Sequence, residues 1–119
     1  MTIERRRTSQ RMSHIVEFPL SGTMVVLAGQ VSSDPDLDLA GQTRNILDKI
    51  DSLLIEAGTD KSAITHAYVW LAHVTDFDAM NAVWDAWVAP GHAPARACVE
   101  ARLADPRLRV EIQVFAAKS

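Results

Sequence analysis

Apolar positions that recur every three to four residues predict two helices. Over residues 39–57 these positions form a continuous stripe, which is the pattern of a helix with one buried face. Asp38 stands where an N-cap residue is expected, and Gly58 stands where the chain leaves the helix. A second stripe predicts a helix over residues 77–87, with Asp76 as its N-cap.

Runs of apolar, aromatic and β-branched residues predict strands between and around these helices. They cover residues 15–18, 24–31, 64–74, 95–101 and 109–116. The first two flank Gly22 and predict a hairpin. The third has apolar or aromatic side chains on both alternating faces and predicts a central strand that is covered on both sides. The order β-β-α-β-α-β-β indicates an α+β domain, with a mixed sheet and two helices on one face.

The N-terminal segment differs in character from the rest of the chain. Residues 1–11 include four arginines, Arg5, Arg6, Arg7 and Arg11, and show no clear periodicity. We expect a flexible basic lead-in there, followed by a single domain over residues 12–119. A chain of 119 residues is the usual size for one domain.

Composition and charge exclude several classes of protein. With 48% apolar and 23% charged residues the chain is typical of globular proteins. The net charge of −3 opposes nucleic-acid binding, so the N-terminal arginines are interpreted as solvated. No apolar run is long enough to span a bilayer, and no secretory signal opens the chain. A single cysteine, Cys98, allows no internal disulfide. We therefore expect a cytoplasmic protein with no membrane or nucleic-acid partner.

Alternation along the last two strands sorts their side chains into two sets. On the final strand, Glu111 and Gln113 point away from the face that carries the apolar residues. On the preceding strand the apolar set suits the helices, so Arg96 and Cys98 are expected on the second face, beside Glu111. Two helices cover only one face of a sheet, and the aromatic residues on the other face predict oligomerisation through it. The plain alternative is a salt bridge between Arg96 and Glu111 at the interface, with no chemical task.

Several short motifs together resemble one family. The run PARACVE at 94–100, followed by VEIQ at 110–113 and FAA at 115–117, resembles the C-terminal signature of the Rid/YjgF/L-PSP family. Asp76-Phe77 with Met80-Asn81, LAGQ at 27–30, and Gln42-Thr43 are similar to further family motifs, and the resemblance spans about residues 12–117. It implies a chorismate-mutase-like (YjgF/L-PSP) α+β fold and a homotrimer. In such a trimer the sheets line a central barrel and clefts lie between neighbouring subunits.

The resemblance also implies a reaction and two catalytic residues. The family's characterised activity is hydrolysis of reactive 2-imino and 2-enamino acids, such as 2-aminoacrylate, to the 2-keto acid and ammonia, with no metal or organic cofactor. Arg96 matches the arginine that holds the substrate carboxylate, and a planar guanidinium suits that bidentate contact. Glu111 matches the glutamate that holds or activates the attacking water.

The remaining expected site residues are carried over in the same way. Gly29 allows close approach of a ligand to the backbone, Asn81 supports the cleft, and Cys98 lines it through its backbone carbonyl. Met12 stands where family deaminases carry a tyrosine, and Ala28 stands where many members have serine or threonine. Both departures bear on substrate choice. The expected partners are a small carboxylate-bearing substrate and further copies of the chain.

Two other functions compete with imine hydrolysis. The first is a non-catalytic trimer that binds small carboxylates or a partner protein through the same cleft. The second is ribonuclease activity, reported in parts of the family, which the acidic net charge opposes. A metal site is not expected, because His66 and His73 are seven residues apart on a predicted strand and would face opposite sides.

Overall fold

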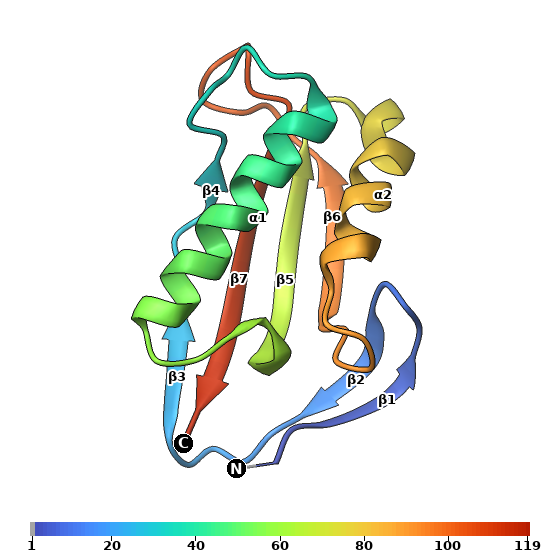
Figure 1. Ribbon diagram of the computed structural model, residues 1–119. Helices are drawn as coiled ribbons and strands as arrows, with labels where there is room; N and C mark the ends of the chain where they lie inside the picture. Colours follow the sequence, from blue (N-terminus) through green and yellow to red (C-terminus); the bar gives the residue numbers. More distant parts are fainter. Residues whose placement is uncertain (1) are drawn as a thin grey trace.

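The computed structural model describes residues 2–119 as two helices packed against one face of a sheet, with a separate two-stranded hairpin (Figure 1). The strands of the hairpin are β1 (Glu4–Thr8) and β2 (Ser13–Glu17). The sheet strands are β3 (Thr23–Val26), β4 (Gln30–Val31), β5 (Ile64–Leu71), β6 (Ala95–Glu100) and β7 (Val110–Lys118). The helices are α1 (Leu39–Glu56) and α2 (Phe77–Trp87), with short 3-10 turns η1 (Lys61–Ala63) and η2 (Val74–Asp76).

The sheet is mixed, and β7 lies near its centre. The order is β3-β7-β5-β6, with β4 also paired to β7. All pairs that involve β7 are antiparallel, whereas β5 and β6 run parallel. Since β6 pairs with β5 and not with β7, the last two strands of the chain are separated by β5. Both helices lie on the same face (Figure 1), which confirms the predicted α+β arrangement.

Helix α1 follows its sequence signals closely. The Asp38 carboxylate accepts a hydrogen bond from the Gly41 backbone N–H at 2.7 Å, which satisfies one of the free donors of the first turn. The apolar stripe is fully buried at Ile46, Ile50 and Leu54. At the other end Gly58 adopts φ = +85°, a conformation that glycine adopts without strain. The predicted cap, stripe and stop are confirmed.

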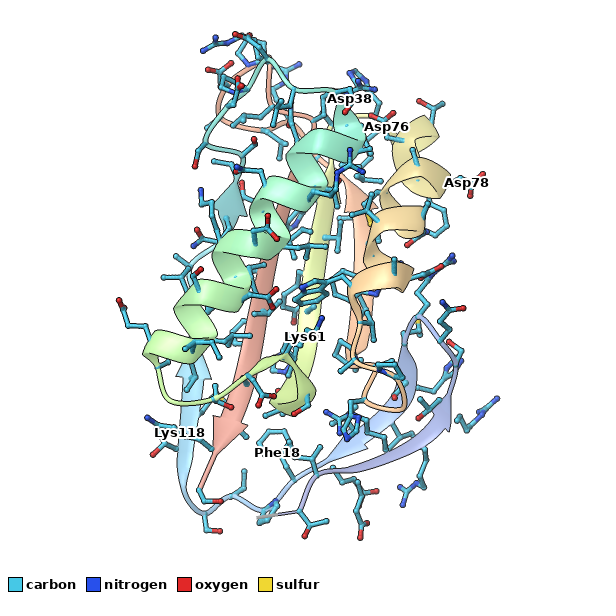
Figure 2. The ribbon with its side chains drawn as sticks, in the orientation of Figure 1. Phe18, Asp38, Lys61, Asp76, Asp78 and Lys118 are labelled. Carbon is cyan, nitrogen blue, oxygen red and sulfur yellow. The ribbon has the colours of Figure 1, made fainter. Side chains whose placement is uncertain are left out.

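Helix α2 begins differently from the prediction. Asp76 occupies the N-cap position but its side chain makes no capping hydrogen bond. Its carboxylate instead pairs with the Arg109 guanidinium, with oxygen-nitrogen distances of 2.8 and 3.2 Å. Figure 2 shows Asp38 and Asp76 at the same end of the molecule, where both helices start. Asp76 therefore joins α2 to the beginning of β7.

The N-terminal region pairs in a way that the sequence did not predict. The expected hairpin around Gly22 is wrong, because β2 pairs with β1 and β3 pairs with β7. The lead-in expected over residues 1–11 contains a strand, Glu4–Thr8; Met1 lies outside the described residues. The Arg5 guanidinium donates to the backbone carbonyls of Ser62 and Ile64, at 3.0 Å each. These bonds, with the ladder to β2, hold the segment against the domain.

The predicted strand over residues 24–31 is interrupted. Val26 lies opposite Phe115, whereas Gln30 lies opposite Ile112. Three residues on the β3–β4 side thus span the same length as two residues of β7. This one-residue excess is a β-bulge, which bends a strand and often lies beside a functional site.

The two faces of the sheet have different surroundings. Toward the helices, Val69, Ile112 and Val114 are completely buried. On the other face, four apolar side chains are exposed, namely Met24 (52%), Val26 (57%), Tyr68 (42%) and Val99 (53%). The strand predicted over residues 64–74 is therefore covered by the helices on one side only, and the prediction that one chain covers both sides is wrong. We refer to this uncovered side as the open face. No helix within residues 2–119 is long and apolar enough to cross a bilayer.

Candidate functional site

Arg96 and Glu111 lie on opposite faces of the sheet. Arg96 pairs with Ala67 on β5, and Glu111 pairs with Trp70. Paired residues point the same way, and positions 67 and 70 are an odd number of residues apart, so their side chains face opposite sides. Ala67 belongs to the buried core. The expectation that Arg96 and Cys98 share a face with Glu111 is therefore wrong, because the register of β6 on β5 turns them toward the helices.

The Arg96 guanidinium is half-buried beneath α2. Its central carbon lies 5.0 Å from the centroid of the Trp84 ring, within the range of a cation–π contact. One of its nitrogens lies 3.8 Å from the Met80 sulfur. Burial lowers the pKa of Arg96, although a guanidinium stays protonated at physiological pH. Within residues 2–119, Arg96 forms no ion pair with a carboxylate. Its donors are thus available to an anionic ligand.

Asn81 and Cys98 contribute to the same side of the sheet. Asn81 is 1% exposed, and neither its amide nitrogen nor its oxygen has a hydrogen-bond partner within residues 2–119. A buried amide without partners costs free energy unless something else satisfies it, so Asn81 is a candidate ligand contact. Cys98 packs against the core, and burial raises the pKa of its thiol. A neutral thiol is a poor nucleophile, which fits a packing role.

The turn of the N-terminal hairpin borders this region. The Trp84 indole N–H donates to the backbone carbonyl of Arg11 at 2.9 Å. The Arg11 guanidinium makes two hydrogen bonds to Asp85, at 2.9 and 3.0 Å. Met12 follows in the same turn, and its carbonyl accepts from Ser9. We call Met12, Asn81, Arg96 and Cys98 the arginine cluster.

Sequence reasoning did not single out Arg11 or Trp84 as site residues. Arg11 fell in the segment interpreted as a lead-in, and Trp84 fell on the buried stripe of a helix. The sequence held one signal for Arg11. It precedes Met12, which the family resemblance matches to the pocket, so Arg11 could have been assigned to the border of that pocket. The contact between the two residues depends on how the hairpin folds onto α2, which no local pattern shows.

Glu111 lies on the open face beside the bulge. Its strand neighbours are Val31 on β4 and Trp70 on β5. A Cβ atom built on Gly29 would lie 2.2 Å from a carboxylate oxygen of Glu111, so only glycine leaves room for this carboxylate. Ala28 precedes Gly29 in the bulge, and its carbonyl accepts from the Gln30 side chain at 3.0 Å. We call Ala28, Gly29 and Glu111 the glutamate cluster.

Aromatic side chains continue the open face away from the glutamate cluster. The rings of His66 and Phe115 stack in parallel at 4.2 Å, and Tyr68 meets both rings edge-on. Tyr68 also stacks on Trp70 at 5.9 Å. Exposed apolar surface of this kind is typical of a protein interface. The predicted site residues therefore fall into two clusters, one on each face, and no group of three or more potential metal ligands occurs within residues 2–119.

Comparison with known proteins agrees with the fold and the motifs. The family model described as Endoribonuclease L-PSP matches residues 2–118. A RutC family protein of Haemophilus ducreyi is 46% identical over 101 residues, covering 85% of this chain and 86% of that protein. The 2-iminobutanoate/2-iminopropanoate deaminase of Escherichia coli is 29% identical over 104 residues, covering 82% of this chain and 81% of that protein.

The fold is also found in solved structures. A crystal structure of a YjgF-family protein from Neisseria meningitidis superposes with a TM-score of 0.78 at 42% identity, covering 100% of this chain and 97% of that one. The match extends over both helices and every strand, so it includes the elements that carry both clusters. The chain therefore belongs to the L-PSP endoribonuclease family, which is also known as the Rid, YjgF or RutC family.

Proposed function

We propose that the protein hydrolyses small 2-imino and 2-enamino acids, such as 2-aminoacrylate, to 2-keto acids and ammonia. The observation that carries the proposal is the half-buried Arg96 guanidinium, which has no carboxylate partner within residues 2–119. Such a group suits a planar carboxylate ligand. The deaminase of the same family, at 29% identity, supports the reaction class.

The proposed site is formed by two copies of the chain. Since Arg96 and Glu111 lie on opposite sheet faces, one copy would supply the arginine cluster and its neighbour the glutamate cluster. The exposed apolar residues of the open face support an assembly through that face. A homotrimer, as the family resemblance implies, would bring each arginine cluster next to a neighbouring glutamate cluster.

The mechanism requires positioning of the substrate and a series of proton transfers. An enamine such as 2-aminoacrylate first takes up a proton from water on its β-carbon, which gives the protonated imine. Arg96 pairs with the substrate carboxylate and places the imine carbon near Glu111 of the neighbouring copy. Glu111 accepts a proton from water as the oxygen attacks the protonated imine carbon, which forms a carbinolamine. Return of the proton to nitrogen makes ammonia the leaving group, and it departs as the hydroxyl oxygen gives its own proton to water and becomes the carbonyl oxygen of the keto acid. An imine is already electrophilic, so the main contribution of the protein is orientation.

Met12 favours one alternative, a trimer that binds small carboxylates without turning them over. A thioether at position 12 donates no hydrogen bond, unlike the tyrosine of family deaminases. Arg96 serves binding and catalysis equally well. Glu111→Gln separates the two functions: loss of turnover with retained affinity for pyruvate supports catalysis. A wild-type protein that binds pyruvate but does not accelerate hydrolysis supports binding alone.

The first test measures pyruvate release from freshly generated 2-aminoacrylate. We expect the wild type to exceed the spontaneous rate and Arg96→Ala to lose that acceleration. A wild-type rate equal to the spontaneous rate would reject 2-aminoacrylate as a substrate.

A second test addresses the two-copy site. Arg96→Ala and Glu111→Gln, each inactive alone, are unfolded together in equal amounts and refolded as mixed oligomers. If the site takes one residue from each copy, about a quarter of the sites regain both groups. A site within a single copy would regain none, because every chain lacks one of the two residues.

A further inference from the structure

The Arg11–Asp85 ion pair lies beside the arginine cluster but belongs to no predicted site. Arg11 comes from the hairpin turn, and Asp85 follows Trp84 on α2. Both carboxylate oxygens of Asp85 are engaged, one by each of two guanidinium nitrogens at 2.9 and 3.0 Å. Trp84 connects this ion pair to Arg96. Its indole N–H donates to the Arg11 carbonyl, and its ring lies near the Arg96 guanidinium.

Both members of the ion pair act on Arg96 electrostatically. Burial is the largest influence and lowers the pKa of Arg96; the nearby Arg11 charge lowers it further, and the Asp85 carboxylate raises it. The placement agrees, because Asp85 follows Trp84, whose ring lies 5.0 Å from the Arg96 guanidinium carbon, and stands one helical turn beyond the buried Asn81. Paired with Arg11, the Asp85 carboxylate is next to an opposite charge. Asp85 alone would present a full negative charge at the same place.

An unengaged Asp85 would therefore compete with a substrate for Arg96. A half-buried guanidinium without an anionic partner attracts any nearby carboxylate strongly, because the surroundings screen charge less than water does. An internal pair between Arg96 and Asp85 would occupy the donors that a ligand needs. The bidentate contact to Arg11 removes this possibility, since it uses both Asp85 oxygens.

We propose that Arg11 is a positioning residue that holds Asp85 away from Arg96 and so keeps the Arg96 guanidinium free for a carboxylate ligand. The inference rests on the proposed function only in that Arg96 binds the ligand. It assigns a task to a segment that the sequence alone suggested was a solvated lead-in.

The test is a set of variants with pyruvate as the ligand. Arg11→Met should raise the dissociation constant for pyruvate about tenfold, as expected for an added competing charge, while kcat with 2-aminoacrylate changes little. Asp85→Asn added to Arg11→Met should restore the affinity, because it removes the competitor. Arg6→Met is the matched control: it breaks the exposed Arg6–Glu17 ion pair on the same hairpin and should leave the affinity unchanged.

The double variant distinguishes this role from simple support of the hairpin. If Arg11 only anchors the hairpin, the double variant lacks the anchor as well and should bind pyruvate as weakly as Arg11→Met. That result, or an unchanged affinity in Arg11→Met, would overturn the proposal.

A readout that needs no ligand separates this inference from the proposed function. The side-chain Nε–H signal of Arg96, assigned by its loss in Arg96→Lys, should shift in Arg11→Met and return in the double variant. If the wild type neither binds pyruvate nor hydrolyses 2-aminoacrylate, the proposed function fails. An Arg96 signal that is identical in the wild type and Arg11→Met would reject the inference itself.

Discussion

The two faces of the sheet differ in burial and in the character of their side chains. Along β7, Ile112 and Val114 are completely buried under the helices, whereas Glu111 and Gln113, which alternate with them, are half-buried on the open face. The covered face holds the core of the chain. The open face exposes apolar and aromatic side chains around one carboxylate. One strand thus supplies the core through alternate residues, whereas the residues between them would serve the proposed assembly and chemistry.

Arg96 is an exception to this division between the two faces. It is a charged residue on the covered face, at the edge strand β6, where the cover by α2 is incomplete and leaves it half-buried. A cation there is tolerated because the Trp84 ring lies next to it and part of it reaches solvent. The two proposed catalytic residues therefore lie on opposite faces of the sheet.

The largest expected effect separates the contributions of the two faces to stability. Ile112→Ala, on the covered face, should lower the free energy of unfolding by about 3 kcal/mol, because it removes buried methyl groups and leaves a cavity. Val99→Ala, on the open face, should cost less than about 1 kcal/mol in a dissociated chain. Urea denaturation at low protein concentration measures both values. Equal losses would contradict the assignment of one face to the core.

A charge on the open face should break the assembly. Val99→Asp places a carboxylate in apolar surroundings if a neighbour covers that face, at a cost of about 2 kcal/mol or more. Size-exclusion chromatography with light scattering should then show a shift from the oligomer to the monomer. Leu20→Asp is a matched control, since Leu20 is 97% exposed in a loop outside the sheet. An intact oligomer in Val99→Asp would argue against an interface on the open face.

A methyl group at the bulge tests the glutamate cluster. Gly29→Ala brings a Cβ atom to 2.2 Å from the present position of a Glu111 oxygen, so the carboxylate must move. We expect kcat for 2-aminoacrylate to fall about tenfold, because small displacements of a reacting group are costly. Thermal unfolding should change little. The double variant Gly29→Ala/Glu111→Asp has a shorter acid, which relieves the overlap, so it should recover part of the activity. A wild-type rate in Gly29→Ala would show that the position of Glu111 does not matter for the reaction.

The smallest expected effect is a pH dependence that comes from the open face. Burial lowers the pKa of His66, whose ring stacks on Phe115. The unfolded chain therefore binds a proton more readily than the folded chain, and the free energy of unfolding should fall as the pH drops below about 6.5. His66→Phe keeps an aromatic ring and removes the titration, so its unfolding free energy should depend less on pH between about 7 and 5. Parallel curves for the two proteins would exclude this contribution.

Local patterns predicted much of the fold. Capping, the apolar stripe and the glycine stop of α1 are all properties of neighbouring residues, and all three are confirmed. The alternation along β7 also placed Val110, Ile112 and Val114 correctly in the core. The hairpin partner of β2 was missed, because pairing is decided by contacts between distant segments. The Asp76 side chain was misassigned for the same reason, since its partner Arg109 is 33 residues away.

The sequence by itself determined the family, the two helices and the two sets of alternating side chains on each strand. The tertiary structure decided which set of one strand shares a sheet face with which set of the next strand. Alternation relates residues within one strand only, and the pairing register between strands sets the rest. The parallel register of β6 on β5 sets Arg96 beside Ala67 and therefore under α2. The one-residue bulge between β3 and β4 sets Gly29 beside Glu111. Backbone pairing between segments far apart in the chain thus placed the two charged residues on opposite faces of one sheet.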